Sequence, residues 1–204
     1  MVVPSGKLVS KRFRVAAVAV VVVAVLVVAV ILYDFSSGSS SSAISANGQL
    51  SNAGEVLVSE GSTYPAIVHV IRGSLNATDN SISASVVVGG VISSVAGQEN
   101  VQWTLLLILQ NQTATLETYT VNLELNSSGF FGEWNNVTTG EVVPCNVSYV
   151  GSSLFAQANV DLGGVTQIEW NVNSVYQSYS DGALVAYASD TAPDVGFATL
   201  NLPS

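Results

Sequence analysis

From Glu55 onward, apolar and polar side chains alternate along the chain in short segments. In TYTVNLEL (residues 118–125) the odd-numbered residues are apolar or aromatic, and in QIEWNVN (residues 167–173) the even-numbered ones are. Because successive side chains of a β-strand point to opposite faces, this period of two predicts strands with one buried face. Further strands are predicted at EVLVSE (55–60), AIVHVIR (66–72), ISASVVV (82–88), VQWTLLLILQ (101–110), SLFAQANVDL (153–162), ALVAYA (183–188) and VGFATLNL (195–202).

Turn signals separate these segments at Gly89–Gly90, NSSG (126–129), Gly163–Gly164 and SDG (180–182). Gly, Asn, Asp and Ser favour turns through positive φ angles or through hydrogen bonds to their own backbone. No apolar pattern with the period of a helix follows residue 43, and WTLLLILQ, apolar on both faces, is interpreted as a central strand. The sequence predicts an all-β domain, an antiparallel two-sheet sandwich or jelly roll of about eight to ten strands.

Before this domain, residues 15–33 form a run of 19 residues without a charged side chain. At about 1.5 Å per residue, a helix of this length nearly covers a hydrocarbon core of about 30 Å. Four basic residues precede the run, which predicts a cytoplasmic N-terminus and an exterior body. The predicted organisation is a cytoplasmic basic segment (1–14), a transmembrane or signal-anchor helix (15–33), a Ser/Gly-rich linker (34–54) and an extracellular β-sandwich domain (55–204).

Two other fates of the apolar run stay open. A secretory signal would be removed near Ser41–Ala43 or Ala43–Ser45, and pilin-type processing would cut near SKRFR (10–14). Signal peptides have apolar regions of about 7–15 residues followed closely by a small-residue cleavage site. Here the run is longer and the first such sites lie well beyond it, which favours an uncut anchor.

Charge is divided sharply between the two parts of the chain. Of the five basic residues, four precede the apolar run and the fifth is Arg72. The 14 acidic residues begin at Asp34, so residues 34–204 combine one basic with 14 acidic side chains and carry a formal charge of −13. Such a domain repels nucleic acid. Charged residues are only 9% of the chain, so solubility must come from Ser, Thr, Asn and Gln, which is unusual for a cytosolic protein.

Asn-x-Ser/Thr triplets occur five times, and all of them fall in the predicted exterior domain. Each lies near a predicted turn or strand end, where an acceptor asparagine is accessible. This agreement with the topology predicts covalent N-glycans on several of them. The five asparagines are Asn76, Asn111, Asn126, Asn136 and Asn146.

Residues that carry chemistry are few. His69 is the only histidine and lies in an alternating segment, so we interpret it as a half-buried structural side chain. Cys145 is the only cysteine, which excludes an intramolecular disulfide and a His/Cys metal cluster. We therefore predict no enzyme activity and no cofactor. Calcium candidates are Asp181, Asp190 and Asp194, although loop Asp residues more often cap turns.

The three tryptophans receive two different interpretations. Trp103 and Trp170 occupy alternating positions and are predicted to lie in the core. Trp134 follows Phe130 and Phe131 in GFFGEWNN, which we interpret as a loop. These three side chains are predicted to form an exposed contact patch.

The segment AISANGQLSNAGEVLVSEG (43–61) follows the Ser/Gly-rich tract. It contains an apolar piece in which Val56 and Val58 would face one side of a strand and Leu57 the other. An extended segment of this kind can add to a free sheet edge, either in its own domain or in a neighbouring copy. The sequence thus permits assembly by strand donation, with Val56 to Val58 as the predicted donor.

Two resemblances agree with such an assembly. KRFRVAAVAVVVVAVLVVAVILYDFSSG (11–38) resembles the N-terminus of archaeal type IV pilins. The Ser/Thr/Asn-rich, Lys-poor β-domain behind an apolar segment resembles the archaeal surface-filament subunits called threads and bundling pili, which implies fibrous assembly and donor-strand exchange. We expect a non-catalytic, glycosylated and self-associating subunit of an extracellular filament or surface layer. The alternative is a single-pass membrane-anchored adhesin or binding module.

Overall fold

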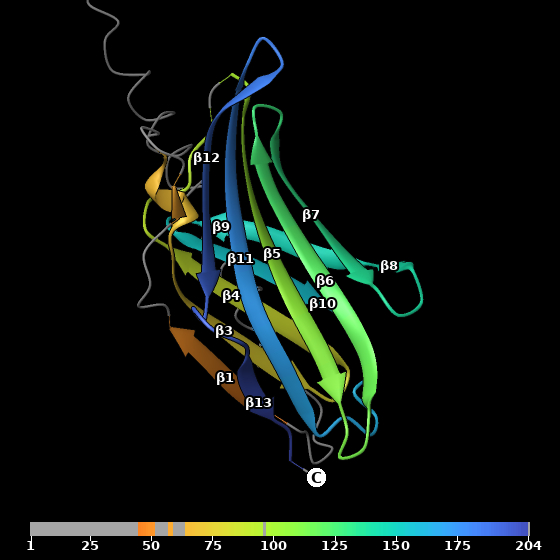
Figure 1. The fold of residues 1–204 in the computed structure, drawn as a ribbon. Coiled ribbons are helices and arrows are strands. Elements are labelled where there is room, and N and C mark those ends of the chain that lie inside the picture. Colours follow the sequence, from red (N-terminus) through yellow and green to blue (C-terminus); the bar gives the residue numbers. More distant parts are fainter. Residues whose placement is uncertain (1–44, 52–56, 59–63, 96, 204) are drawn as a thin grey trace, which may run out of the picture. The chain divides into compact units, whose positions relative to one another are not determined.

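The computed structural model describes residues 45–51, 57–58, 64–95 and 97–203, which form β-strands and one short 3-10 helix. The strands build two antiparallel sheets (Figure 1). This confirms the all-β prediction. The predicted cytoplasmic segment and membrane helix lie outside these residues. Among the residues described, no helix is both long and apolar enough to cross a membrane.

The smaller sheet, called sheet A here, has five strands, and each neighbouring pair is antiparallel. Its edges are β1 and β9. The register of β3 against β4 shifts between Val70 and Arg72, which leaves Ile71 in a bulge. In spatial order the strands are β1 (Ala46–Ser51), β3 (Val70–Thr78), β4 (Ser81–Val88), β10 (Ser153–Ala158) and β9 (Cys145–Val150).

The larger sheet, sheet B, has eight strands with β5 between β11 and β6. This confirms the central position predicted for WTLLLILQ. The strands β12 and β13 lie one after the other along the same side of β11. In spatial order the strands are β2 (Leu57–Val58), β12 (Ala183–Ala192), β11 (Gln167–Ser180), β5 (Glu99–Gln110), β6 (Thr115–Asn126), β7 (Gly129–Asn136) and β8 (Glu141–Val143), with β13 (Ala198–Asn201) beside β11.

The apolar faces of the two sheets enclose one hydrophobic core, in a sandwich-like arrangement. The strands of sheet A run obliquely across those of sheet B (Figure 1). The alternation predicted for residues 118–125 and 167–173 is confirmed, since their apolar positions are buried. Trp170 of sheet B lies over Gly73 of β3, where an added Cβ would come within 3.1 Å of the indole ring. Glycine at this position therefore lets the two sheets approach each other.

The outer face of sheet B carries Leu106 and Ile108 among many polar side chains, and several of these polar side chains bond to one another across the strands. The Thr104 hydroxyl donates to Asn122 over 3.0 Å, and the Thr191 hydroxyl donates to Asn173 over 2.7 Å. Hydroxyl and amide pairs of this kind contribute to strand pairing without any charge. They explain how a domain with few ionised side chains presents a hydrated sheet surface.

Three regions differ most from the sequence-based prediction. AIVHVIR begins as the 3-10 helix η1 (Ala66–Val68), and β3 starts only at Val70. Ile67 and Val68 are both buried, which successive residues of a half-exposed strand cannot be. The strands β1, β7, β8 and β9 were not predicted. β1 lies inside the predicted linker, and the other three fall in a segment rich in Gly, Asn and Thr.

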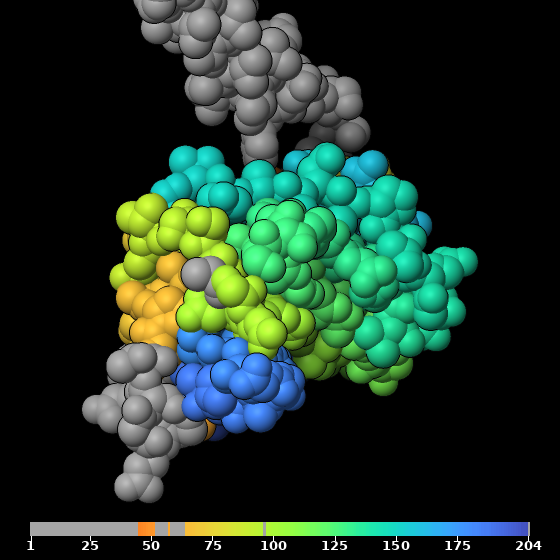
Figure 2. All heavy atoms as spheres, turned by 90° about the horizontal axis from the view of Figure 1, so that it is seen from above, coloured from red at the N-terminus to blue at the C-terminus, as the bar shows by residue number. Residues whose placement is uncertain are grey.

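The connection between β4 and β5, residues 89–98, crosses from sheet A to sheet B. The Ile92 amide donates to the Gly151 carbonyl in the β9–β10 turn over 2.8 Å. The Tyr179 amide donates to the Gln98 carbonyl over 3.1 Å, near the β11–β12 hairpin. Figure 2 looks onto this end, where the yellow-green connection lies between the teal turn and the blue hairpin. Main-chain hydrogen bonds thus tie both sheets to the connection.

A second close approach of the sheets occurs between β7 and β9. A Cβ added at Gly132 would lie 2.5–2.9 Å from three side-chain atoms of Val147. Next to this contact, Phe130 and Tyr149 meet edge to face with ring centroids 5.1 Å apart. The absence of a side chain at Gly132 is what allows these two strands to pack.

We predict that Gly132→Ala destabilises the domain by about 1–3 kcal/mol, because the new methyl group overpacks this contact. Val147→Ala alone should cost about 1–2 kcal/mol through the lost methyl groups. The double variant should lose less than the sum of the two single losses, since the smaller side chain makes room for the new methyl. Urea unfolding of the four proteins measures these free energies, and strictly additive losses would contradict the contact.

Candidate functional site

Several of the predicted glycosylation asparagines shape turns with their own side chains. The Oδ1 atom of Asn111 accepts hydrogen bonds from the amides of Thr113 and Ala114, each at 2.9 Å. The Oδ1 atom of Asn126 accepts from the Ser128 amide at 2.8 Å. These are Asx turns, which satisfy backbone donors that strand pairing leaves free. Asn111 and Asn126 therefore have structural uses whether or not they carry glycans.

Asn136 is a correction to the predicted glycosylation set. Its side chain is only 5% exposed, and its Oδ1 atom accepts from the amides of Thr138 and Thr139 at 2.9 and 3.1 Å. A glycan needs free space around the side-chain nitrogen, which a buried asparagine does not have. The Asn-Val-Thr triplet at this position serves the turn between β7 and β8. Glycosylation of the other four asparagines stays a prediction.

The two remaining sequon asparagines lie on the outer face of sheet A. The register places Asn76 of β3 and Asn146 of β9 in one row that crosses all five strands. Neighbouring strands lie about 4.8 Å apart, so these asparagines are separated by about 14 Å. Asn146 is exposed and Asn76 is half-buried. The row consists of Asn47, Asn76, Ser83, Gln157 and Asn146.

The predicted strand-donor residues follow a longer edge strand, β1. Leu57 and Val58 form the two-residue strand β2, which pairs with β12, and Val56 lies outside the described residues. β1 comes earlier in the chain and pairs with β3 along all six of its residues. Leu50 of β1 is only 5% exposed, so this strand contributes to the core. The N-terminal segment that completes a sheet edge is therefore β1.

The predicted contact patch is wrong in its most important member. Phe130, Phe131 and Trp134 belong to β7, whose alternation directs Phe130 and Trp134 inward and Phe131 outward. Trp134 is fully buried, and Phe130 packs against the core. Only Phe131 is exposed, because the segment is a strand of sheet B and not a loop.

The three calcium candidates do not form one site. Asp181 lies in the β11–β12 turn, Asp190 lies near the far end of β12, and Asp194 follows that strand. At about 3.3 Å per residue, β12 holds Asp181 more than about 20 Å from Asp190. In the described part of the chain, no group of three or more His, Cys, Asp or Glu side chains could hold a metal ion.

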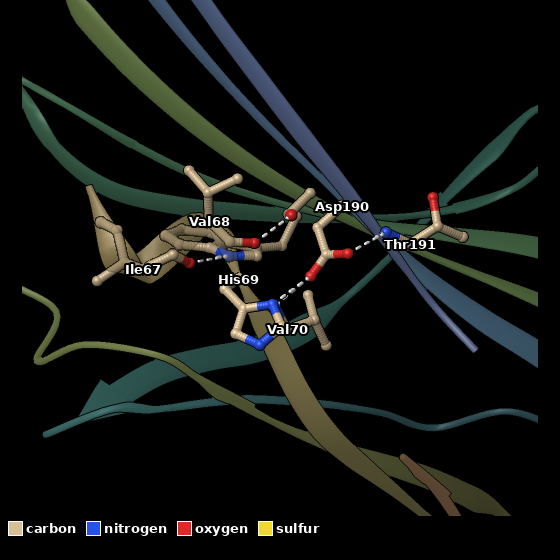
Figure 3. Close-up of polar contacts among 8 residues, drawn as sticks. Ile67, Val68, His69, Val70, Asp190 and Thr191 are labelled. Atoms are coloured by element: carbon tan, nitrogen blue, oxygen red, sulfur yellow. Dashed lines mark hydrogen bonds and ion pairs between the residues drawn. The ribbon is translucent and has the colours of Figure 1, made fainter. Parts of the chain in front are cut away.

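A buried polar cluster surrounds residues 67–70, where the chain leaves η1 and enters β3 (Figure 3). Trp103 of β5 donates its indole N–H to the Ile67 carbonyl at 3.1 Å. Ser174 of β11 donates its hydroxyl to the Val68 carbonyl. Two adjacent strands of sheet B thus satisfy two successive carbonyl groups, which strand pairing does not reach.

Asp190 of the next strand, β12, binds the following residues of the same segment (Figure 3). Its Oδ2 atom accepts a hydrogen bond from the Val70 amide at 2.7 Å and one from Nδ1 of His69 at 2.9 Å. Its Oδ1 atom accepts from the Thr191 amide at 2.9 Å. Asp190 is only 5% exposed, so its carboxylate depends on these donors. We call the side chains of Trp103, Ser174 and Asp190 the polar clamp.

Serine, histidine and aspartate meet in this cluster, but their geometry differs from that of a catalytic triad. A triad requires the serine hydroxyl to bond to the histidine and to face the substrate. Here Ser174 is fully buried and donates to the Val68 carbonyl. His69 is half-buried, as predicted, and lies against Asp190. The arrangement fixes the backbone of residues 67–70 and leaves the hydroxyl engaged.

Two tyrosines have raised pKa values. Burial raises the pKa of Tyr119, and the carboxylate of Glu117, which accepts its hydroxyl, raises it further, while a hydrogen bond with Asn136 opposes the shift. Burial also raises the pKa of Tyr176, which donates to Glu99 over 2.9 Å. Both hydroxyls are kept protonated as donors inside the fold.

Cys145 opens β9 with a half-buried side chain. Burial raises the pKa of its thiol, although a backbone hydrogen bond with Trp134 opposes the shift. The thiolate is the nucleophilic form, and a raised pKa makes it scarce at neutral pH. These features are typical of a cysteine that acts as a small apolar packing residue.

Comparison with known proteins leaves the identity of this chain open. No protein family, curated protein or solved structure matches it. Function must therefore be inferred from the residues whose contacts are described above.

Sequence reasoning missed the polar clamp because its partners are far apart in the chain. Asp190 and Val70 are separated by 120 residues, and no local motif connects them. A signal was nevertheless present in β12. Ala186 and Ala188 occupy the inward positions, and Asp190 is the next inward position along the same strand. A carboxylate on the buried face of a strand requires donors from another element.

We predict that Asp190→Asn lowers the free energy of unfolding by about 2–3 kcal/mol. The amide group cannot accept all three hydrogen bonds, so a buried N–H group such as that of Val70 loses its acceptor. Asp194→Asn, an exposed control, should change stability by less than about 0.5 kcal/mol. Urea unfolding measures both variants, and equal stability of the two would refute the clamp.

We predict that the domain loses stability above about pH 10. A pKa raised in the folded state means that the folded domain holds the proton more tightly. The resulting stabilisation is complete below the unfolded pKa and is lost as the pH rises above it. Tyr119→Phe should reduce the slope of unfolding free energy against pH above pH 10, leaving the contribution of Tyr176. Urea unfolding between pH 8 and pH 11 tests this, and an unchanged slope would argue against it.

Proposed function

We propose that this chain is a non-catalytic, glycosylated structural subunit of an extracellular filament or surface layer, in which β1 of one copy completes sheet A of a neighbour. If residues 15–33 are not cleaved, the proposed subunit is attached to the membrane through them. The observation that carries it is the position of β1, an N-terminal edge strand that directly follows the Ser/Gly-rich segment in sequence.

The contacts of β1 support strand donation. Among the described residues, β1 pairs with β3 and forms an edge strand of sheet A. Its inward residues include Gly48, where an added Cβ would come within 3.2 Å of Leu200, and the buried Leu50. Main-chain hydrogen bonds to β3 supply most of the attachment of β1, and the small inward-facing residues of β1 fit against the opposite sheet. A strand with the same sequence from another copy would make the same contacts.

The alternative is a membrane-anchored adhesin or binding module that keeps β1 for itself. One observation favours it, since β1 lies in full register with β3 of the same chain. Both proposals share the exterior location and the β-domain. They differ in which copy supplies β1.

A disulfide cross-link between register partners distinguishes the two proposals. Gln49 and Ser74 face each other across β1 and β3, and Cα atoms of such pairs lie about 4.5–5.5 Å apart, within disulfide range. In a Cys145→Ala background, the variant with Gln49→Cys and Ser74→Cys should give covalent oligomer ladders in fibres sheared from cells. Non-reducing gel electrophoresis reads the result.

The matched control pairs Gln49→Cys with Ser85→Cys. Ser85 of β4 is opposite Ser74, so it lies two strand spacings, about 9–10 Å in total, from Gln49. This distance is too long for a disulfide. This variant should remain uncross-linked. Complete cross-linking of the first variant within single chains would rule out donation of β1 and support the anchored module.

A further inference from the structure

Phe155 is an exposed aromatic side chain on a sheet face that is polar apart from this ring and the outward-facing Val87 and Val150. It lies on the outer face of β10 and is 40% exposed. The register places Ser85 of β4 on one side of it and Ser148 of β9 on the other. A phenylalanine in this position loses the hydrophobic gain that burial would provide. The structure therefore raises the question of what covers the ring.

The same face carries a glycosylation sequon beside that ring. Asn146, Val147 and Ser148 lie on β9, and alternation sends Asn146 and Ser148 to the outer face while Val147 packs inward. Ser148 is directly opposite Phe155, and Asn146 is its diagonal neighbour. Diagonal neighbours lie about 7–8 Å apart, within reach of an aromatic side chain and of a group attached to Asn146.

We propose that Asn146 carries an N-linked glycan whose first sugar packs on the ring of Phe155. This inference rests on the exterior location in the proposed function. A pyranose ring presents C–H groups with partial positive charge, which the negative face of an aromatic ring attracts. Gln157, directly opposite Asn146, supplies an amide that can bond to the sugar hydroxyls. The stacked sugar shields the exposed ring from water.

The modification requires a sugar donor linked to a lipid phosphate. The Nδ2 atom of Asn146 attacks C1 of the sugar, and the C1–N bond forms as the bond from C1 to the phosphate oxygen breaks. The lipid phosphate departs with the electron pair, and one amide proton is released. No oxidant or reductant takes part.

The other sequons lack this combination. Asn136 is buried, and Asn111 is half-buried in a turn. Asn126 has the exposed Phe131 of β7 as a diagonal neighbour, but Asn126 is half-buried and its Nδ2 atom donates to Glu124 at 2.7 Å. Asn76 shares the outer face of sheet A, but its partners across the strands are Asn47 and Ser83, which offer no ring. Asn146 is the sequon of the described residues in which exposure and a neighbouring aromatic side chain coincide.

A glycan at Asn146 also has a consequence for assembly. β9 is one edge of sheet A, and β1 is the other. Free edges pair with other chains unless something blocks them. A sugar on Asn146 adds bulk to the face beside the β9 margin, whereas the strand at the opposite margin, β1, contains no sequon.

The test uses the full chain exported by a host that performs N-glycosylation. Glycopeptide mass spectrometry should find Asn146 occupied and Asn136 unmodified. Asn146→Gln should lower the Tm by about 2–4 °C in the presence of Phe155. In a Phe155→Ser background, the same substitution should leave the Tm unchanged, because the sugar has no ring to cover. Asn111→Gln is the matched control and should shift the Tm equally in both backgrounds.

Two results would overturn the inference. Asn146 left bare while Asn111 or Asn76 carries a glycan would reject the site. A loss on Asn146→Gln that is the same with and without Phe155 would reject the stacking. Failure of the proposed function gives a different result. If the cross-links between β1 and β3 form only within single chains while Asn146 is occupied, strand donation is rejected and the glycan site is still supported. An exported chain without any glycan would reject this inference and leave the cross-linking result as it stands.

Discussion

The passage of the chain from sheet B to sheet A at residues 67–70 depends on the polar clamp. There the backbone leaves strand pairing while still buried, and each unsatisfied N–H or carbonyl would cost about 1–3 kcal/mol. Trp103, Ser174 and Asp190, on adjacent strands of sheet B, bind successive groups of this short segment. β3 begins where the clamp ends. It pairs with β1 and β4, and β4 in turn carries β10 and β9. Sheet B thereby sets the position of sheet A.

Sequence periodicity predicted the long strands of sheet B because each has one buried face, so apolar residues occupy every second position. The same rule failed where burial did not alternate. Ile67 and Val68 are both buried in η1, and Gly132 on β7 carries no side chain to report its face. Trp134 followed two phenylalanines and was interpreted as part of an exposed loop for that reason. The glycosylation sequons were visible, but the burial of Asn136 and the position of Asn146 beside Phe155 depend on strand register, which no local pattern encodes.

The outer faces explain the unusual composition. On sheet B, hydroxyl and amide side chains bond across the strands, so the surface is hydrated without lysine. On sheet A, small polar residues form rows across the strands, and Phe155, Val87 and Val150 interrupt them. Lysine is a common device for protecting sheet edges, and the only basic side chain of residues 34–204 is Arg72. In our proposal, covalent sugars and pairing with other strands protect its edges.

Strand β1 makes the same contacts whether its own chain or a neighbour supplies it. Contact free energy therefore does not distinguish a closed subunit from a donated strand. What differs is the effective concentration of β1 near β3. For a strand on its own chain, this concentration is set by the length of the connections on either side of it, and it is about millimolar for short flexible linkers. Subunits held side by side on a surface reach comparable local concentrations. The geometry of the segments before and after β1, and not the fit of β1 itself, decides which copy completes sheet A.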